Sequence, residues 1–400
     1  MIYFYVLLLR IVAYIEGPFK MVAFAITFGL ISFSSFNRVS IKSFNKISKY
    51  NFYALALVIL IMFHGFIFGE VLIRDIAVLL TYWIWFVFTF TYFRDKTLNE
   101  SLRFVLISFL IFNFANYLYF KLYFADQFFG INSIMASFGV FGKRIYFPLA
   151  SGANIFTSQL GLNALIVLYF FKNTGKRLFY LSIYGFYIYM LVLADSRLIL
   201  LLSIIFSIIF WFSLKKVLSF FKNTWWIIGL FIFGFLYVFY NTDFFDRFKR
   251  PGELSGGGAI SRIEIWTIAI QVIFDDLHLL FGHGLNGFKN NILESTKETF
   301  NDQHLQTSHN FIIQNLIDFG VFGILIILMV LFKILNLIIQ LKSSILTILI
   351  VMLLLVGITE SIPSFYSFEP TMFFITILSI IFAQDERKNI RFITNNNILS

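Results

Sequence analysis

The chain has 400 residues, of which 59% are hydrophobic, 20% are aromatic and only 13% are charged. A soluble domain is expected to be about half apolar and about a quarter charged, so this composition excludes an ordinary soluble protein and indicates an integral membrane protein. The formal net charge of +10 would suggest a nucleic-acid partner in a soluble protein, but membrane topology explains it better here. No nucleic-acid partner is therefore expected.

The apolar stretches are continuous rather than alternating, which predicts helices. A membrane-spanning helix needs about 20 mostly apolar residues. The expected spans, in chain order, cover residues 2–15, 19–36, 52–69, 72–93, 104–124, 151–171, 178–194, 198–214, 225–240, 311–332, 344–358 and 371–383. We therefore predict an all-α integral membrane protein of about 12 transmembrane helices, in which residues 1–400 form a single polytopic domain. The first segment lacks a cationic start and a cleavage site, so we expect it to be retained as a helix.

Basic residues collect on one set of connections between these spans, and this asymmetry predicts the orientation. The basic residues on that side are Arg38, Lys42, Lys46, Lys49, Arg94, Lys96, Arg103, Lys172, Lys176, Arg177, Lys215, Lys216, Lys222, Lys333, Lys342, Arg387, Lys388 and Arg391. Because basic connections remain in the cytoplasm, both termini are predicted to be cytoplasmic. The long polar loop 241–308 is predicted to lie on the outer face.

A helix with a candidate anion site is predicted inside this loop. Ser261 and Glu264 have the spacing of a capping box, and apolar residues recur at helical spacing from 265 to 274, which indicates an amphipathic helix at the membrane interface. Arg262 would lie in its first turn, where free backbone N–H groups and a guanidinium both suit phosphate oxygens. The alternative is that Arg262 only extends toward lipid headgroups.

A second arginine opens a membrane helix on the same outer face. Arg197 follows Ser196 and begins the apolar run 198–214. A guanidinium at this position needs water, a headgroup or a charged partner, and Asp195 is the nearest candidate. Pairing with Asp195 or a headgroup and binding of a lipid diphosphate are both consistent with the sequence.

His309 precedes the apolar run 311–332, so it is expected in the first turn of a membrane helix at its outer boundary. An imidazole can accept a proton at ordinary pH, which makes His309 a candidate base. The alternative is a helix cap or headgroup contact. The loop residues His278, His283 and His304 are expected to be solvated, and Asp275 and Asp276 have no neighbouring histidine–carboxylate motif of the kind that binds metals. No metal and no cofactor are therefore predicted.

Three signatures in chain order resemble the O-antigen polymerase and O-antigen ligase family of bacterial envelope glycosyltransferases. The first is the Ser196–Arg197 pair at the head of a helix. The second is Arg262 followed by the glycine-rich turn that contains Gly282 and Gly284. The third is His309 followed by Asn310 at a helix start, with the Gly320–Gly323 segment after it. The resemblance covers residues 195–332.

The resemblance implies that a glycan on an undecaprenyl diphosphate carrier is transferred to a sugar hydroxyl at the periplasmic face of the bacterial inner membrane. His309 would orient or deprotonate the acceptor hydroxyl, while Arg197 and Arg262 would hold the departing diphosphate. Gly282, Gly284 and Asn310 are expected to help bind the substrate. The implied partners are undecaprenyl-diphosphate-linked glycans, membrane lipid and a chain-length-regulating membrane protein.

Polymerisation of lipid-linked repeat units is the favoured reaction, because polymerase sequences of this kind are diverse and often rich in Phe, Ile and Asn. The alternative is an O-antigen ligase, which transfers the glycan to the lipid A–core. A polysaccharide flippase or another transporter with 12 helices is a further alternative. Transport is disfavoured because transporters are expected to have paired halves and charges near the bilayer midplane, whereas the charges here gather at the outer boundary.

Overall fold

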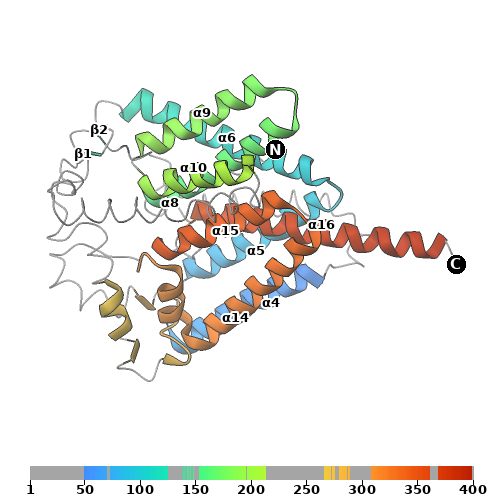
Figure 1. Ribbon diagram of the computed structural model, residues 1–400. Coiled ribbons are helices and arrows are strands. Elements are labelled where there is room, and N and C mark those ends of the chain that lie inside the picture. Colours follow the sequence, from blue (N-terminus) through green and yellow to red (C-terminus); the bar gives the residue numbers. More distant parts are fainter. Residues whose placement is uncertain are drawn as a thin grey trace, which may run out of the picture.

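The computed structural model describes residues 49–69, 73–124, 138–139, 142–143, 145, 147, 153–194, 196–212, 265–271, 273–274, 279–285, 287–288, 308–360 and 368–398. Within these ranges the protein is almost entirely helical (Figure 1). The expected spans 2–15, 19–36 and 225–240 lie outside the described residues, as do Arg262, Asp195, and Ser261 with its capping-box partner Glu264.

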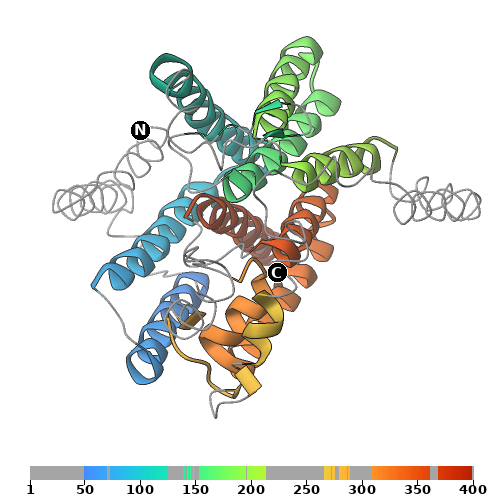
Figure 2. The ribbon, with the colours of Figure 1, turned by 90° about the vertical axis from the view of Figure 1, so that its left-hand side faces the viewer.

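The described part of the chain is a bundle of long helices (Figures 1 and 2). In chain order these are α4 (Lys49–Phe68), α5 (Ile73–Phe93), α6 (Leu98–Tyr119) with the π-helical turn η1 (Phe120–Phe124), α8 (Ala153–Asn173), α9 (Arg177–Leu193), α10 (Arg197–Phe212), α14 (Phe311–Leu341), α15 (Ser344–Thr359) and α16 (Phe368–Ile398). Two-residue strands, β1 (Phe138–Gly139) and β2 (Gly142–Lys143), form a small antiparallel pair.

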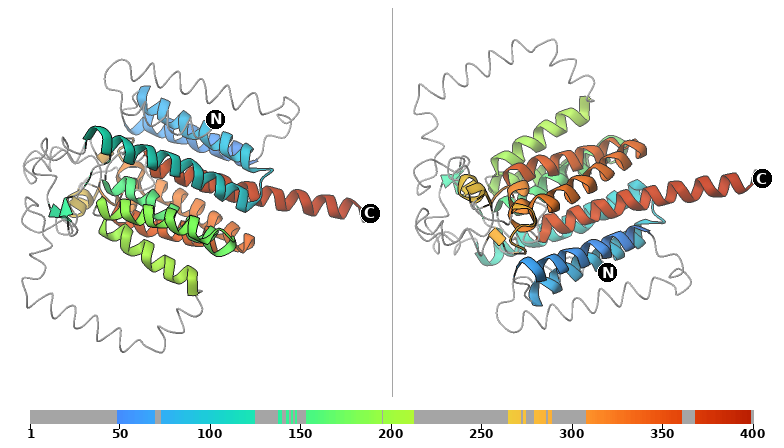
Figure 3. Two further views of the ribbon diagram at one scale, coloured as in Figure 1. Left: turned by 90° about the horizontal axis from the view of Figure 1, so that it is seen from above. Right: turned by 90° about the horizontal axis from the view of Figure 1, so that it is seen from below.

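Each span expected within the described residues corresponds to one of these helices. Two helices are much longer than their expected spans, because hydropathy reports the apolar length and not the end of the helix. Helix α14 continues through Lys333 to Leu341, so Lys333 lies within a helix and not in a connection. Helix α16 continues past its apolar part, and its C-terminal portion extends beyond the rest of the bundle (Figure 3).

Four of the described helices are long and apolar enough to cross a membrane. They are the segments Lys49–Phe68, Asp75–Phe93, Leu98–Leu122 and Phe311–Leu341. The apolar helices Arg177–Leu193, Arg197–Phe212 and Ser344–Ile358 are shorter. Large apolar side chains such as Phe63, Leu201 and Met329 are more than half exposed on the outer surface of the bundle. Because a soluble protein rarely exposes so much apolar surface, these faces indicate an integral membrane protein.

Helix α8 lies at the centre of the packing, in contact with α6, α9, α10, α15 and α16. Its glycine, Gly161, lets two neighbours approach closely: a Cβ added there would lie 2.6 Å from Ser203 Oγ of α10 and 2.7 Å from Met352 Cε of α15. Small residues serve this purpose between membrane helices. The side chain of Gln159 donates a 2.7 Å hydrogen bond to Asn113 of α6. Close packing and buried polar contacts therefore hold the centre of the bundle together.

The ends of the described helices gather at two opposite ends of the bundle (Figure 3). At one end, Gln384 Nε2 donates to the carbonyl of Lys96 at 2.8 Å, Lys172 Nζ donates to Phe210 at 3.3 Å and Lys388 Nζ donates to Gln340 at 3.4 Å. Several of the basic residues expected on the cytoplasmic side thus gather at this end. Figure 2 looks onto the opposite end, which we call the site end. There α14 begins and α15 ends.

Candidate active site

The site end is built around the first residues of α14. Asn310 is the N-cap, with an extended backbone (φ −150°, ψ 124°). Its Oδ1 accepts hydrogen bonds from the backbone N–H groups of Ile312 and Ile313, at 2.8 and 3.0 Å. Asparagine is among the preferred N-cap residues because its side chain satisfies N–H groups that have no partner within the helix. The local sequence thus fixes the start of α14 at this point.

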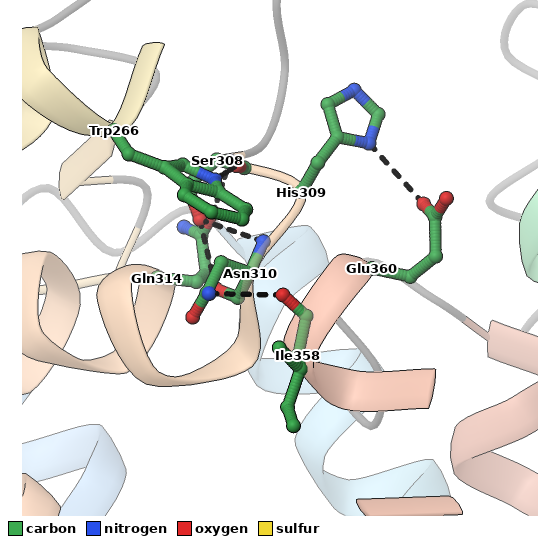
Figure 4. Close-up of polar contacts among 7 residues, drawn as sticks. All are labelled: Trp266, Ser308, His309, Asn310, Gln314, Ile358 and Glu360. Carbon is green, nitrogen blue, oxygen red and sulfur yellow. Dashed lines mark hydrogen bonds and ion pairs between the residues drawn. The ribbon is translucent and has the colours of Figure 1, made fainter. Parts of the chain in front are cut away.

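Ser308 anchors the other side of the same turn. Its N–H donates to Gln314 Oε1 at 2.9 Å, and its carbonyl accepts a 2.8 Å hydrogen bond from the indole Nε1 of Trp266. Its hydroxyl donates to the carbonyl of Asn310 at 2.9 Å and accepts from the Asn310 N–H at 3.3 Å. The residues on both sides of His309 are therefore fixed by polar contacts (Figure 4).

His309 occupies the tip of this turn in a left-handed conformation, with φ of 51°. A residue with a Cβ atom loses on the order of 1–2 kcal/mol in that conformation. Such strain persists only where the surrounding structure imposes it, and it is common at functional sites. The turn therefore holds the His309 backbone in an unfavourable geometry and directs its imidazole away from α14.

The imidazole of His309 points toward the end of α15. Its Nδ1 lies 3.2 Å from Oε2 of Glu360; the side chain of His309 is 35% exposed, whereas that of Glu360 is 5% exposed. A second contact joins the same two segments, because Asn310 Nδ2 donates to the carbonyl of Ile358 at 3.0 Å. Figure 4 shows the other imidazole nitrogen directed away from Glu360. One ring nitrogen is thus engaged by a carboxylate and the other faces outward.

Arg197 is the first residue of α10 and lies at the site end, as the sequence predicts. The preceding residue, Ser196, is buried, and its hydroxyl accepts a 2.7 Å hydrogen bond from Thr157 of α8. The Ser196 carbonyl accepts from the N–H of Leu200 at 2.9 Å, which begins the helix. The start of α10 and the turn before α14 lie at the same end of the bundle, so the structure places Arg197 and His309 at the site end on separate segments.

The glycine-rich turn around Gly282 packs against α14 at a break in that helix. Gly320 has φ of 65° and ψ of −169°, which interrupts the helical hydrogen bonding. The carbonyls of Ile317 and Asp318 accept instead from the N–H groups of His283 and Gly284, at 2.8 and 2.9 Å. The N–H of Phe322 donates in return to the carbonyl of Leu280 at 3.1 Å. The turn thus replaces hydrogen bonds that the helix has lost.

Two pairs of glycines allow this approach of backbone to backbone. A Cβ at Gly282 would lie 2.5 Å from the Gly320 nitrogen, and one at Gly320 would lie 2.4 Å from the Leu280 carbonyl. A Cβ at Gly284 would lie 2.6 Å from Gly69 Cα, at the end of α4. The N–H of Gly284 is engaged by α14, so these contacts give Gly282 and Gly284 a role in assembling the site end. Their expected part in substrate binding remains a prediction.

The predicted amphipathic segment of the loop also packs on α14. Residues 265–271 are helical, and Ile265, Ala269 and Ile273 are buried together with Phe288 and Ile317 of α14. The opposite face carries Phe274, which is exposed. The apolar face expected to meet the membrane interface therefore lies against the start of α14, where Trp266 reaches Ser308.

The sequence did not single out Glu360, Gln314 or the indole hydrogen bond of Trp266. Glu360 follows an apolar run 50 positions after Asn310, and neither spacing nor a motif connects the two. In the described part of the chain no group of three or more His, Asp or Glu side chains is arranged to hold a metal ion. Asp275, Asp276, His278 and His304 lie outside that part. His283, expected to be solvated, is instead buried in the glycine-rich turn.

Comparison with known proteins finds a family match for one region of the chain. Residues 182–328 match the model of a family described as O-antigen ligase. No curated protein matches the chain. The matched region contains Arg197, Gly282, Gly284, His309 and Asn310, whereas Glu360 lies beyond it. This match supports the O-antigen polymerase and O-antigen ligase family, as the order of the motifs predicted.

Proposed function

We propose that this protein is a membrane glycosyltransferase that joins undecaprenyl-diphosphate-linked oligosaccharide units into O-antigen or a related surface polysaccharide. The reaction takes place at the outer face of the bacterial inner membrane. The observation that carries the proposal is the fixed, half-exposed imidazole of His309 beside Glu360, at a helix start within the region that matches the family model.

His309 accepts the proton of the acceptor sugar hydroxyl in this proposal. The hydroxyl oxygen then forms a bond to the anomeric carbon of the donor glycan, while the bond from that carbon to the diphosphate oxygen breaks. The electron pair of the broken bond leaves with the undecaprenyl diphosphate. A base placed at the reacting hydroxyl contributes typically about 10²–10⁴-fold to such a rate.

The departing diphosphate gains negative charge during this step. Arg197 and Arg262 hold it in our proposal, since pre-placed guanidinium groups stabilise developing phosphate charge and bind its oxygens in a bidentate manner. Arg197 lies at the site end with His309, which is consistent with this role. The two arginines make a metal ion unnecessary for charge stabilisation.

A ligase reaction is the second candidate, because the matching family is described as O-antigen ligase and its match fits both reactions. It uses the same donor and the same residues, but the acceptor hydroxyl belongs to the lipid A–core. The two reactions differ in what accumulates when the protein is missing. Loss of a polymerase leaves single repeat units on the core, whereas loss of a ligase leaves lipid-linked polymer that is not attached.

The test is the surface-glycan ladder of a deletion strain, complemented with wild type, His309→Ala, Arg197→Ala or Arg262→Ala at matched expression. A ladder reduced to core plus a single unit supports the polymerase, and loss of all attached units supports the ligase. His309→Ala is expected to lower transfer by about 10²–10⁴-fold, and each arginine variant by about 10²–10³-fold. An unchanged ladder in the deletion strain would contradict both reactions and favour a transporter.

A further inference from the structure

We propose that Glu360 is a positioning residue for His309. In this role it fixes the orientation and tautomer of the imidazole and stabilises the positive charge that the ring acquires when it takes the acceptor proton. The inference rests on the proposed glycosyl transfer. It assigns a role to a residue that lies outside both the sequence motifs and the region matched by the family model.

The geometry joins the two residues through a rigid frame. Glu360 is the C-cap of α15, and its backbone N–H donates to the carbonyl of Val356 at 2.9 Å. Two residues earlier, the carbonyl of Ile358 accepts from Asn310, the N-cap of α14. The backbones that carry His309 and Glu360 are therefore held against each other independently of the 3.2 Å contact between Nδ1 and Oε2.

The position of the Glu360 carboxylate does not favour the stability of the fold. Glu360 is only 4% exposed, and burial of a carboxylate costs free energy unless it is paired or hydrogen-bonded. It also lies at the C-terminus of a helix, where the helix dipole disfavours negative charge. A neutral side chain would avoid both costs. A buried carboxylate directed at an imidazole is suited to set the tautomer and charge of that imidazole.

The contact determines which ring nitrogen is available. A carboxylate that accepts from Nδ1–H holds the proton on that nitrogen, because the hydrogen bond made by one ring nitrogen selects the tautomer. The lone pair then lies on Nε2, the nitrogen directed away from Glu360 in Figure 4. Nε2 can take the acceptor proton, and the adjacent carboxylate then balances the charge of the imidazolium. Glu360 itself does not touch the substrate in this scheme.

The test mixes the full-length purified protein with membranes of the deletion strain, which supply the lipid-linked glycan made before the transfer step. Glu360→Gln removes the charge but keeps the shape. This substitution is expected to lower the maximal rate at least about tenfold, which is a smaller effect than that of His309→Ala. It should leave the half-saturating substrate amount unchanged. In a His309→Ala background the same substitution should have no further effect, because a residue that acts through another is not additive with it.

Asp385→Asn is the matched control. Asp385 is also a buried acid, 7% exposed, and it accepts a hydrogen bond from Tyr50 away from the site end. At equal amounts of folded protein, D385N is expected to retain the wild-type rate. Glu360→Asp keeps the charge on a shorter side chain and is expected to be faster than E360Q, so folding defects and loss of the carboxylate can be distinguished.

The possible results separate the role of Glu360 from the proposed function. An inactive His309→Ala together with an E360Q as fast as D385N would overturn the role of Glu360 and leave the proposed function intact. If E360Q lowered the transfer rate by the same factor with and without His309, Glu360 would be purely structural, and its positioning role would be overturned. An E360D no faster than E360Q would have the same meaning. A wild-type protein that transfers no lipid-linked glycan, or an active His309→Ala, would overturn the proposed function or its site together with this inference.

Discussion

Two turns meet α14 near its start, and they are held in different ways. Polar side chains hold the turn of Ser308, His309 and Asn310, and these contacts leave one imidazole directed outward. The turn of residues 280–285 is held by backbone hydrogen bonds to α14, and glycines at the contact leave no room for a side chain. The first arrangement presents a reactive group and the second closes the bundle. Substitutions in the first should therefore change activity more than stability, and substitutions in the second should do the reverse.

The largest stability effect is expected at the glycine contact. Gly320→Ala places a Cβ atom 2.4 Å from the carbonyl carbon and oxygen of Leu280 and requires a positive φ, so it should destabilise the protein by well over about 1 kcal/mol. Gly185→Ala in α9 is the control, since nothing lies within 4 Å of its added Cβ, and it should be neutral or stabilising by about 0.5–1 kcal/mol. Thermal unfolding in detergent measures both. Equal melting temperatures for the two variants would contradict the tight packing of the glycine turn.

An intermediate effect, on both stability and activity, is expected at Asn310. Asn310→Ala removes the cap and the contact to Ile358, and should cost roughly 0.5–2 kcal/mol from the cap alone. Asn310→Asp keeps the capping oxygen but cannot donate to the Ile358 carbonyl. We expect N310D to retain most of the stability while its transfer rate falls, because α14 and α15 are then less firmly aligned. Unfolding curves and transfer rates on the same preparations separate the two roles, and an N310D with the wild-type rate would show that the alignment is unimportant.

The smallest effect is expected from the indole hydrogen bond to the polar turn. Trp266→Phe removes the donor to the Ser308 carbonyl and should cost about 1 kcal/mol, with a modest fall in transfer rate. Trp85→Phe removes a comparable 2.9 Å hydrogen bond, to Thr376 inside the bundle, and should leave the rate per folded molecule unchanged. Transfer assays at matched amounts of folded protein compare the pair. If both variants lost activity equally, Trp266 would have no specific influence on the turn.

The sequence alone predicted the helical membrane architecture, because the length of an apolar run reports whether a segment can cross a bilayer. The apolar run also predicted that α14 begins at Phe311, whereas His309, expected in the first turn, precedes the Asn310 cap and lies outside the helix. Helix ends were less predictable: α16 continues into polar sequence that hydropathy does not register as helix. The number of spans in the whole chain and its orientation in the membrane remain predictions.

Tertiary structure alone decided what lies beside His309. Glu360 is 51 residues away in the chain, and only the packing of α14 against α15 brings the carboxylate to the imidazole. The same holds for the glycine pairs Gly282–Gly320 and Gly69–Gly284, because the sequence does not reveal which glycines pack against each other. Local periodicity and capping depend on neighbours within a few residues, so they can be read directly from the sequence. Contacts between distant segments depend on how the helices pack, and the chain order of the motifs did not contain that information.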